Sequence, residues 1–268
     1  MSKISKFLPD IKTYEDLEIS SDNTSFLNPT SIFDTDKLPN AKQKLDSFFT
    51  FIMTTKDLDI DDLSGIKELS YIHLGYTLHN SKGNGPNSNQ TQALILALSE
   101  ILDKYPVVDK LDNTGKKISS FSLFMKDFGA DSISDLTAQI ISKELYEFTI
   151  DTVKQSNYAK FINPVPKTDP IYLKYWNEDH WDTFEVTEGL YLDGNFTMLI
   201  PKDISDNKRF KQNPDDFINK VIIPRVKKDY HGKNKKEIFK ILTENKSHKE
   251  LVQEEMKINE QGFLDYWN

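Results

Sequence analysis

Two aspartates four residues apart are the side chains in this sequence best suited to hold a divalent cation. Asp131 and Asp135 stand in the stretch GADSISD, at the expected start of a helix. Carboxylates at this spacing can converge on one Mg²⁺ or Mn²⁺ ion. Aspartates at a helix start also stabilise the helix, by about 1 kcal/mol, through capping and the helix dipole. The spacing alone favours this second interpretation.

A lysine at the end of an expected core strand is the second candidate. Lys202 follows Leu199-Ile200-Pro201, and a lysine so placed can stabilise the charge of a phosphate in a metal-dependent nuclease. The nuclease motif D…(D/E)-x-K needs an acid two residues before the lysine, where this chain has Ile200. A conventional restriction-type site is therefore incomplete, and an exposed surface lysine is the alternative.

A glycine-rich loop offers a third candidate site, for phosphate. Lys82, Gly83 and Gly85 lie between an expected strand and an expected helix, and the amides of a helix N-terminus attract anions. Neither G-x-x-x-x-G-K-[ST] nor G-x-G-x-x-G occurs, so an ordinary connecting loop is the alternative. The chain has no cysteine, and its five histidines show no metal-ligand spacing.

The pattern of apolar residues predicts an α+β fold that positions these side chains. The expected core has a helix at 41–54, a strand at 70–78 and a buried central helix at 91–105. Two hairpins are expected, one across Asp112-Asn113-Thr114-Gly115 and one across Asp193-Gly194-Asn195. Residues 1–40 are expected to form an irregular arm.

A long helix is expected after Gly129, with Ser132 as its N-cap. Its apolar stripe begins with Ile133 and Ile140, but an acidic column takes over the same face further along; the column is Glu144, Glu147 and Asp151. The stripe therefore changes face halfway, which indicates either fuller burial of the first half or a polar cleft at the second.

The last quarter of the chain is expected to be helical and lysine-rich. Asn213-Pro214 is a strong helix start, Pro224 is expected to interrupt that helix, and Gly232 to break the next link. Further helices are expected at 234–243 and 247–259, with the aromatic C-terminus docked on the body. The predicted division is an α+β core at 1–206 and a basic helical segment at 207–268 packed on it.

Charge is distributed unevenly along the chain. Residues 10–70 carry 13 acids and six lysines, and residues 207–250 carry 13 bases and six acids, within a total of −8. The basic stretch predicts contact with nucleic acid. Only Arg209 and Arg225 are arginines, so we expect lysine–phosphate contacts without sequence specificity. Alternatively, the two blocks face each other or lie on opposite solvated surfaces.

No stretch approaches the ~20 apolar residues that a membrane-spanning helix needs, and none forms a signal peptide. The absence of cysteine fits a reducing compartment. We therefore expect a cytoplasmic protein with no membrane partner.

The middle of the chain, over roughly residues 70–205, contains in order HLGYTLHNSKGNG, FGADSISDLTAQII, two tryptophans and a segment ending IPKD. In this order of motifs it resembles a group of uncharacterised bacterial proteins associated with phage-defence and restriction-type gene neighbourhoods. It implies a defence role and assigns no residue a mechanism.

Together these observations predict a bacterial anti-phage defence protein that acts on nucleic acid, with a metal-dependent nuclease as its enzymatic form. In that form Asp131 and Asp135 hold Mg²⁺ or Mn²⁺, Lys202 stabilises the phosphate, and Lys82 with the loop glycines binds the backbone. The alternative is a non-catalytic subunit of a defence complex whose basic helices bind a partner protein.

Overall fold

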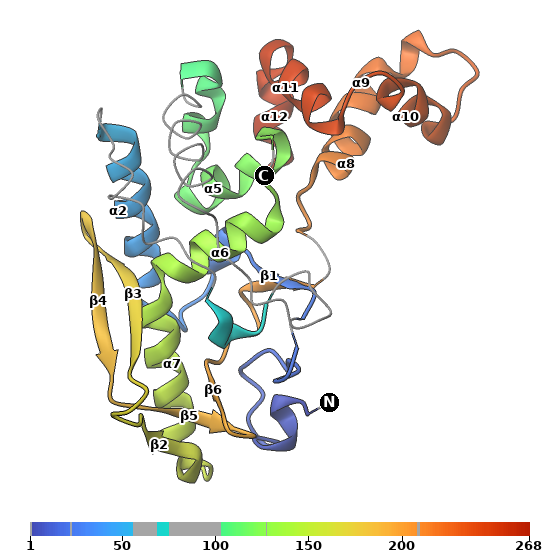
Figure 1. The fold of residues 1–268 in the computed structure, drawn as a ribbon. Helices are drawn as coiled ribbons and strands as arrows, with labels where there is room; N and C mark the ends of the chain where they lie inside the picture. The colour runs from blue at the N-terminus through green and yellow to red at the C-terminus, as the bar shows by residue number, and fades with distance from the viewer. Residues whose placement is uncertain (1, 22, 56–68, 75–102, 127, 208–209) are drawn as a thin grey trace.

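The structure, a computed structural model, describes residues 2–21, 23–55, 69–74, 103–126, 128–207 and 210–268. The described part combines helices with small antiparallel sheets, which confirms the α+β prediction (Figure 1). Its α-helices are α1 (Pro29–Ile32), α2 (Ala41–Thr54), α5 (Thr114–Phe124), α6 (Ala130–Ile140), α7 (Ser142–Lys154), α8 (Pro214–Phe217), α9 (Ile223–Val226), α10 (Lys235–Thr243), α11 (His248–Ile258) and α12 (Glu260–Tyr266). Single 3₁₀ turns are η1 (Ile4–Lys6), η2 (Ser70–Ile72), η3 (Pro106–Lys110), η4 (Ala159–Phe161) and η6 (Lys227–Asp229), and η5 (Ile218–Ile222) is a π-helical turn.

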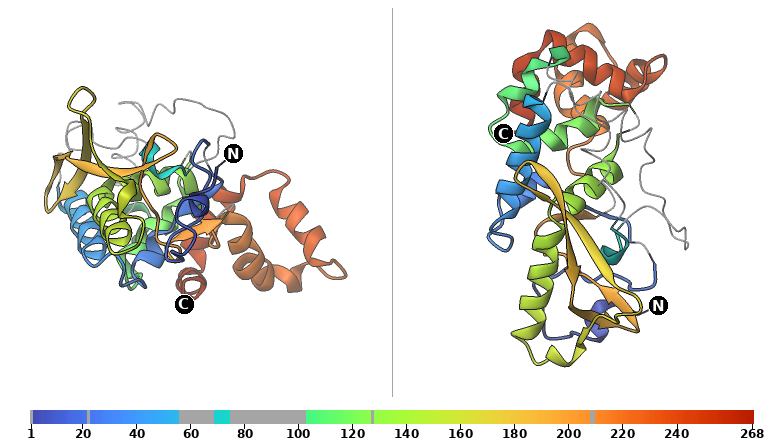
Figure 2. Two further views of the ribbon diagram at one scale, coloured as in Figure 1. Left: turned by 90° about the horizontal axis from the view of Figure 1, so that it is seen from below. Right: turned by 60° about the vertical axis from the view of Figure 1, so that its left-hand side comes forward.

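Seven short strands form three separate sheets in the described residues. They are β1 (Ser25–Leu27), β2 (Ile162–Pro164), β3 (Ile171–Asn177), β4 (His180–Val186), β5 (Glu188–Leu192), β6 (Asn195–Thr197) and β7 (Ser205–Asn207). The sheets have the orders β1-β7, β2-β5-β6 and β3-β4, all antiparallel. Helix α7 runs alongside the β3–β4 and β5 strands, and α2 lies beside the β3–β4 tip (Figures 1 and 2).

The hairpin predicted across Asp193-Gly194-Asn195 is confirmed. Strands β5 and β6 pair as Leu192 with Asn195 and Leu190 with Thr197. Asp193 has φ 52° and Gly194 has φ 80°, the left-handed backbone that a two-residue hairpin turn with matching twist requires. Aspartate and glycine are among the residues that adopt it most readily.

The hairpin predicted across residues 112–115 is wrong, because this segment starts helix α5. The Asn113 side chain accepts a hydrogen bond from the Lys116 N–H and caps the helix. Gly115 is needed for close packing and not for a turn: a Cβ there would lie 2.5 Å from the carbonyl oxygen of Pro29 in α1. Turn residues and helix-capping residues overlap in type, which explains the error.

The second hairpin of the fold is instead formed by β3 and β4. Trp176 lies opposite Trp181, and the two residues at the tip are Glu178, with φ 60°, and Asp179. Trp176 is fully buried, and its indole N–H donates to the Ser47 hydroxyl of α2 (3.0 Å) and to the Glu178 carbonyl (3.1 Å). These bonds fix the hairpin tip against α2.

The helix predicted at 41–54 is confirmed, with the same bounds and the same buried face. Leu45, Phe48, Phe49 and Ile52 are all buried. The ring of Phe48 meets that of Trp176 edge to face at 5.1 Å, a geometry that adds about 1 kcal/mol to the burial of both rings. Helix α2 is thus tied to the β3–β4 hairpin by both packing and hydrogen bonding.

The long helix expected after Gly129 is two helices. Helix α6 begins at Ala130 with Gly129 as its N-cap, so the predicted N-cap Ser132 is wrong. The chain leaves helical geometry at Ile141 (φ −103°, ψ 21°) and resumes as α7. Ser142 donates from its hydroxyl to the Lys174 carbonyl of β3 (2.8 Å), and the side-chain amide of Gln139 donates to the same oxygen. This break explains why the apolar stripe changes face.

The strand predicted at 70–78 is wrong where the structure describes it. Residues 70–72 form η2, and His73 has φ 54°. Leu74 makes a single parallel bridge to Asn23. The expected loop with Lys82, Gly83 and Gly85, and the expected buried helix up to residue 102, lie outside the described residues.

The C-terminal helices begin and end close to their predicted bounds. Asn213 caps α8 by accepting a hydrogen bond from the Asp216 N–H. Gly232, with a φ of 76°, interrupts the helical backbone before α10, as predicted. The prediction that Pro224 interrupts this helix is wrong, because α8, η5 and α9 follow one another without a gap. The π-helical turn η5 ends two residues before Pro224, which has no N–H to donate, so the helix continues with altered geometry at this point. Phe263 and Trp267 are buried, so the C-terminus docks as predicted.

The C-terminal helices pack on the core through α11. Lys249 donates from Nζ to the carbonyls of Met125 (2.6 Å) and Phe128 (2.8 Å) just after α5. Gln253 donates to the Phe124 carbonyl (2.7 Å). The irregular N-terminal arm also joins the core, with Ile4, Leu8, Tyr14, Leu17 and Ile19 buried. None of the described helices is long and apolar enough to cross a membrane.

Candidate functional site

The predicted metal pair lies at the start of α6. Asp131 is in the first turn of this helix, and both aspartates are partly exposed. Asp135 lies in the second turn of the helix and not in the first turn as expected, because the helix begins at Ala130 and not after Ser132. Between them, Ser134 is buried and its hydroxyl accepts from the Leu27 N–H of β1 (2.9 Å), which anchors this turn to the β1–β7 sheet.

No third metal ligand joins this pair in the described part of the chain, where no group of three histidine, aspartate or glutamate side chains can hold one ion. A divalent ion at Asp131 and Asp135 would therefore complete its coordination with water and phosphate oxygens, as Mg²⁺ commonly does.

Lys202 is exposed at a turn and does not end a strand ladder. Strand β6 stops at Thr197. Residues 198–200 are buried, but their backbone groups bond to three different parts of the chain and not to one neighbouring strand. The Met198 N–H donates to the Tyr71 carbonyl, the Leu199 N–H donates to the Thr149 hydroxyl, and the Ile200 carbonyl accepts from the Glu15 N–H. The Lys202 N–H donates to the Thr13 carbonyl (3.0 Å) and leaves its side chain in solvent.

The predicted basic segment contains a compact positive surface, residues 227–240, which we term the basic lobe. It carries six lysines against two acids, Asp229 and Glu237, for a net charge of +4. All six lysines are exposed, and none forms an ion pair within the residues that the structure describes; they are Lys227, Lys228, Lys233, Lys235, Lys236 and Lys240. The lobe consists of η6, the link after it and most of α10, and it projects from the body next to α9 (Figure 1).

An ion pair between a half-exposed arginine and a buried carboxylate lies just before the basic lobe. Arg225 of α9 donates from Nε and Nη2 to the two carboxylate oxygens of Glu255 in α11, at 2.6 and 2.5 Å. The Glu255 side chain is 2% exposed, and it also accepts from Asn259 (2.7 Å). Arg225, which precedes the lobe, is therefore bound within the fold and is not free to read a base edge, and the lobe itself contains no arginine.

The acids of the 10–70 block that the structure describes do not neutralise the basic lobe. Every ion pair that a base of 207–250 makes in the described residues is with an acid at 206 or beyond. Lysine charges without nearby partners raise the local positive potential, which attracts a polyanion. The sequence left open whether the acidic and basic blocks face each other or lie on separate surfaces. The contacts of the described residues agree with separate surfaces.

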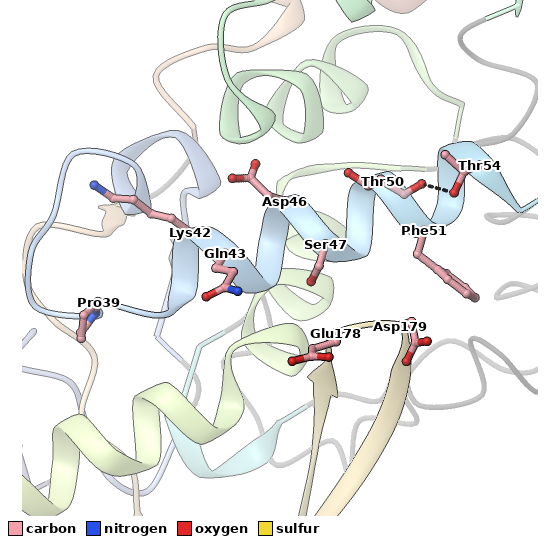
Figure 3. A pocket seen from close by; sticks show the side chains of 10 residues that line it. All are labelled: Pro39, Lys42, Gln43, Asp46, Ser47, Thr50, Phe51, Thr54, Glu178 and Asp179. Carbon is pink, nitrogen blue, oxygen red and sulfur yellow. Dashed lines mark hydrogen bonds between the residues drawn. The ribbon is translucent and has the colours of Figure 1, made fainter.

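A groove of about 640 Å³ lies between α2 and the tip of the β3–β4 hairpin (Figure 3). Lys42, Gln43, Asp46, Ser47 and Thr50 line it from α2, and Glu178 and Asp179 face them from the hairpin tip. Three acids and one lysine make this groove a poor site for phosphate. It contains none of the residues predicted from sequence.

One side of this groove is the tip of the β3–β4 hairpin, and the sequence between the two tryptophans could have predicted that hairpin. Asn177-Glu178-Asp179-His180 is polar and flanked by large aromatic residues, which is typical of a hairpin turn. Without glycine at the tip, the usual hairpin signal is missing.

Comparison with known protein families assigns the chain to one family. A family model described as Domain of unknown function (DUF8370) matches residues 10–212, so the chain belongs to that family. The match ends one residue before Asn213, the cap of α8. The basic lobe thus lies outside the matched region, and Asp131, Asp135 and Lys202 lie inside it. No curated protein and no solved structure matches the chain.

Proposed function

We propose that this protein acts on nucleic acid in bacterial anti-phage defence, and that it holds the phosphate backbone on the basic lobe. The observation that carries the proposal is the set of six exposed lysines without ion-pair partners in the described residues. The defence role is supported by the resemblance of residues 70–205 to proteins of phage-defence neighbourhoods. A cytoplasmic location agrees with both.

The expected binding is strong at low salt and tolerant of sequence. Each lysine that neutralises a phosphate releases a counterion, so the logarithm of the affinity falls with the logarithm of salt by about 0.9 per contact on duplex DNA. Sequence preference should be weak, because Arg225, the arginine of the described residues, is bound to Glu255.

Fluorescence anisotropy with labelled oligonucleotides tests this proposal. Binding to three unrelated duplexes, their single strands and matching RNAs would be measured at 50 and 200 mM salt. Exchanging Lys233, Lys235 and Lys236 for glutamine should weaken binding to all of them and reduce the salt slope by about 3. The matched control exchanges three exposed lysines elsewhere, namely Lys12, Lys160 and Lys167, and should change little. Undetectable binding at 50 mM salt refutes the proposal.

Hydrolysis is the enzymatic form of the proposal. In it Asp131 and Asp135 hold Mg²⁺ or Mn²⁺, which would polarise a phosphodiester and activate water, and Lys202 contacts the phosphate. Asp135→Asn should abolish cleavage of an oligonucleotide while leaving the melting temperature within a few degrees. If cleavage by the wild type is found and survives this change, these aspartates serve only the helix start.

A partner protein is the second candidate for the C-terminal helices, and one observation favours it. Ile258 of α11 is 69% exposed and Ile241 of α10 is 37% exposed, and exposed apolar side chains are common at protein interfaces. Ile258→Asp should disrupt a complex with such a partner while oligonucleotide binding is retained. Loss of oligonucleotide binding in this variant would argue against separate surfaces.

A further inference from the structure

The groove between α2 and the tip of the β3–β4 hairpin (Figure 3), which we term the acidic groove, has exposed carboxylates on both walls. Asp46 comes from α2, and Glu178 and Asp179 come from the hairpin tip. Asp46 and Glu178 form no ion pair with any described residue, and Asp179 pairs with the neighbouring His180, itself 61% exposed. Three acids and Lys42 give the described lining a net charge of −2.

An aromatic ring also lines the acidic groove. Phe51 of α2 is half-buried, and its ring centre lies 5.0 Å from that of Trp176 in β3. An aromatic surface beside carboxylates suits a lysine side chain, because the aliphatic stem covers the ring while the ammonium group reaches an acid. The three carboxylates do not form a group that could hold one metal ion among the described residues. Their spacing therefore suits several separate cationic groups.

The walls of the acidic groove are fixed to each other before any ligand binds. The Trp176 indole N–H donates to the Ser47 hydroxyl of α2 (3.0 Å) and to the Glu178 carbonyl at the hairpin tip (3.1 Å). The Ser47 hydroxyl in turn donates to the Lys44 carbonyl (3.1 Å). A preformed groove loses little conformational entropy on binding, so weak ionic contacts suffice for association.

The basic lobe, residues 227–240, is a cationic surface of the matching kind on the same chain. It has a net charge of +4 within a total of −8, so the rest of the chain carries −12. Its exposed lysines have no ion-pair partners among the described residues, as shown above. The lobe and the acidic groove lie on opposite sides of the molecule in two perpendicular views (Figures 1 and 2). A lobe therefore meets a groove only on another copy of the protein.

We propose that the acidic groove binds the basic lobe of a second copy of this chain. The two surfaces differ, so the contact is heterologous, and copies join head to tail into rings or open chains. Lysine side chains of one copy lie along Phe51 and pair with Asp46, Glu178 and Asp179 of the next. The contact uses the same lysines that bind phosphate in the proposed function, so self-association and nucleic-acid binding exclude each other at a given lobe.

Sedimentation velocity of the full chain tests this contact. At 50 mM salt the weight-average sedimentation coefficient of the wild type should rise with protein concentration up to about 200 µM, a range suited to small transient interfaces. At 200 mM salt the association constant should be at least about tenfold lower, because the Debye length falls from about 14 Å to about 7 Å.

Variants of each surface should be monomeric at 50 mM salt. The groove variant removes the three negative charges with little change of shape, as Asp46→Asn/Glu178→Gln/Asp179→Asn. The lobe variant is Lys233/Lys235/Lys236→Gln. The matched control makes the same change of charge at exposed acids away from the hairpin tip, as Asp151→Asn/Asp169→Asn/Glu185→Gln, and should associate like the wild type.

A mixture of the two monomeric variants gives the sharpest result. The groove variant keeps an intact lobe and the lobe variant keeps an intact groove, so each mixed pair can form one contact. The mixture should therefore form dimers of one copy of each variant and no larger species. A wild type that associates but binds no oligonucleotide supports the contact and refutes the proposed function.

Three results overturn the proposal. One is a wild type that stays monomeric at 50 mM salt over the whole concentration range. Another is a wild type that associates while the mixture of the two variants stays monomeric. The third is association that is lost in the groove variant but persists in the lobe variant, which would show that another segment occupies the groove.

Discussion

The ion pair between Arg225 and Glu255 gives the most quantitative prediction of this structure. Glu255 is 2% exposed and its carboxylate has three hydrogen-bond donors, two from Arg225 and one from Asn259. Arg225→Met leaves a buried carboxylate with the Asn259 amide alone. Removing one partner of a buried pair costs about 3–5 kcal/mol. Because the Arg225 side chain is 42% exposed, water can enter, and we expect a loss of about 2 kcal/mol.

The assay is urea unfolding followed by tryptophan fluorescence and by circular dichroism. Arg225→Lys should recover less than half of the loss, since an ammonium group cannot donate along both N–H directions of the guanidinium. Arg225→Met/Glu255→Leu should lie closer to the wild type than Arg225→Met, because no buried charge is left unpaired. If Arg225→Met costs less than about 0.5 kcal/mol, the pair behaves as an exposed ion pair and the reasoning from burial is wrong.

Three other changes have defined expectations. Lys249→Met removes the donor to the carbonyls of Met125 and Phe128 and should cost about 1–3 kcal/mol in urea unfolding, whereas the exposed Lys257→Met on the same helix should be nearly silent. Glu144→Gln should stabilise the protein at pH 7 and not at pH 4, because burial raises the pKa of Glu144 in the folded protein. Below the unfolded pKa the carboxyl is protonated in both states and contributes its full stability. As the pH rises through the folded pKa this stability is lost in the wild type, and glutamine, which does not ionise, keeps it. A pH series of unfolding free energies checks this, and a constant difference between the two proteins contradicts it. Lys202→Ala should change stability by at most about 0.5 kcal/mol because its side chain is exposed; a sharp fall in oligonucleotide cleavage would show a phosphate contact.

Helical periodicity predicted the helices well where local signals were unambiguous. Residues 41–54 combine a regular apolar stripe with clear ends, and Asn213-Pro214 combines a capping side chain with a residue suited to the first turn. In both places the observed helix begins at the predicted residue, because neighbouring residues decide the outcome without help from the rest of the chain.

Errors occurred where tertiary contacts decide between two local structures. Asp112-Asn113-Thr114-Gly115 suits a turn as well as a helix start, and the close approach of Pro29 in α1 to Gly115 belongs to the helical arrangement. The strand expected up to Lys202 stops at Thr197, because the next backbone groups bond to Tyr71, Thr149 and Glu15, which are distant in sequence.

The candidate sites show the same division between local and distant information. A lysine-rich stretch is visible in any sequence, so the basic lobe was predicted as part of a larger segment; that its lysines lack acidic partners depends on where distant acids lie. The meeting of Lys44 and Lys143 at the Tyr175 ring had no signal at all, since these two lysines are 99 positions apart in the chain. From sequence, Glu144 belonged to one acidic column with Glu147 and Asp151. Both acids follow the break at Ile141 and belong to α7, yet Glu144 is buried while Glu147 stays exposed. Their burial therefore depends on which side of α7 packs against the core, and the hydrogen bonds of Gln139 and Ser142 to the Lys174 carbonyl of β3 help to set that side. These bonds join residues that are distant in the chain, so the sequence could show the acidic column and not the burial of Glu144.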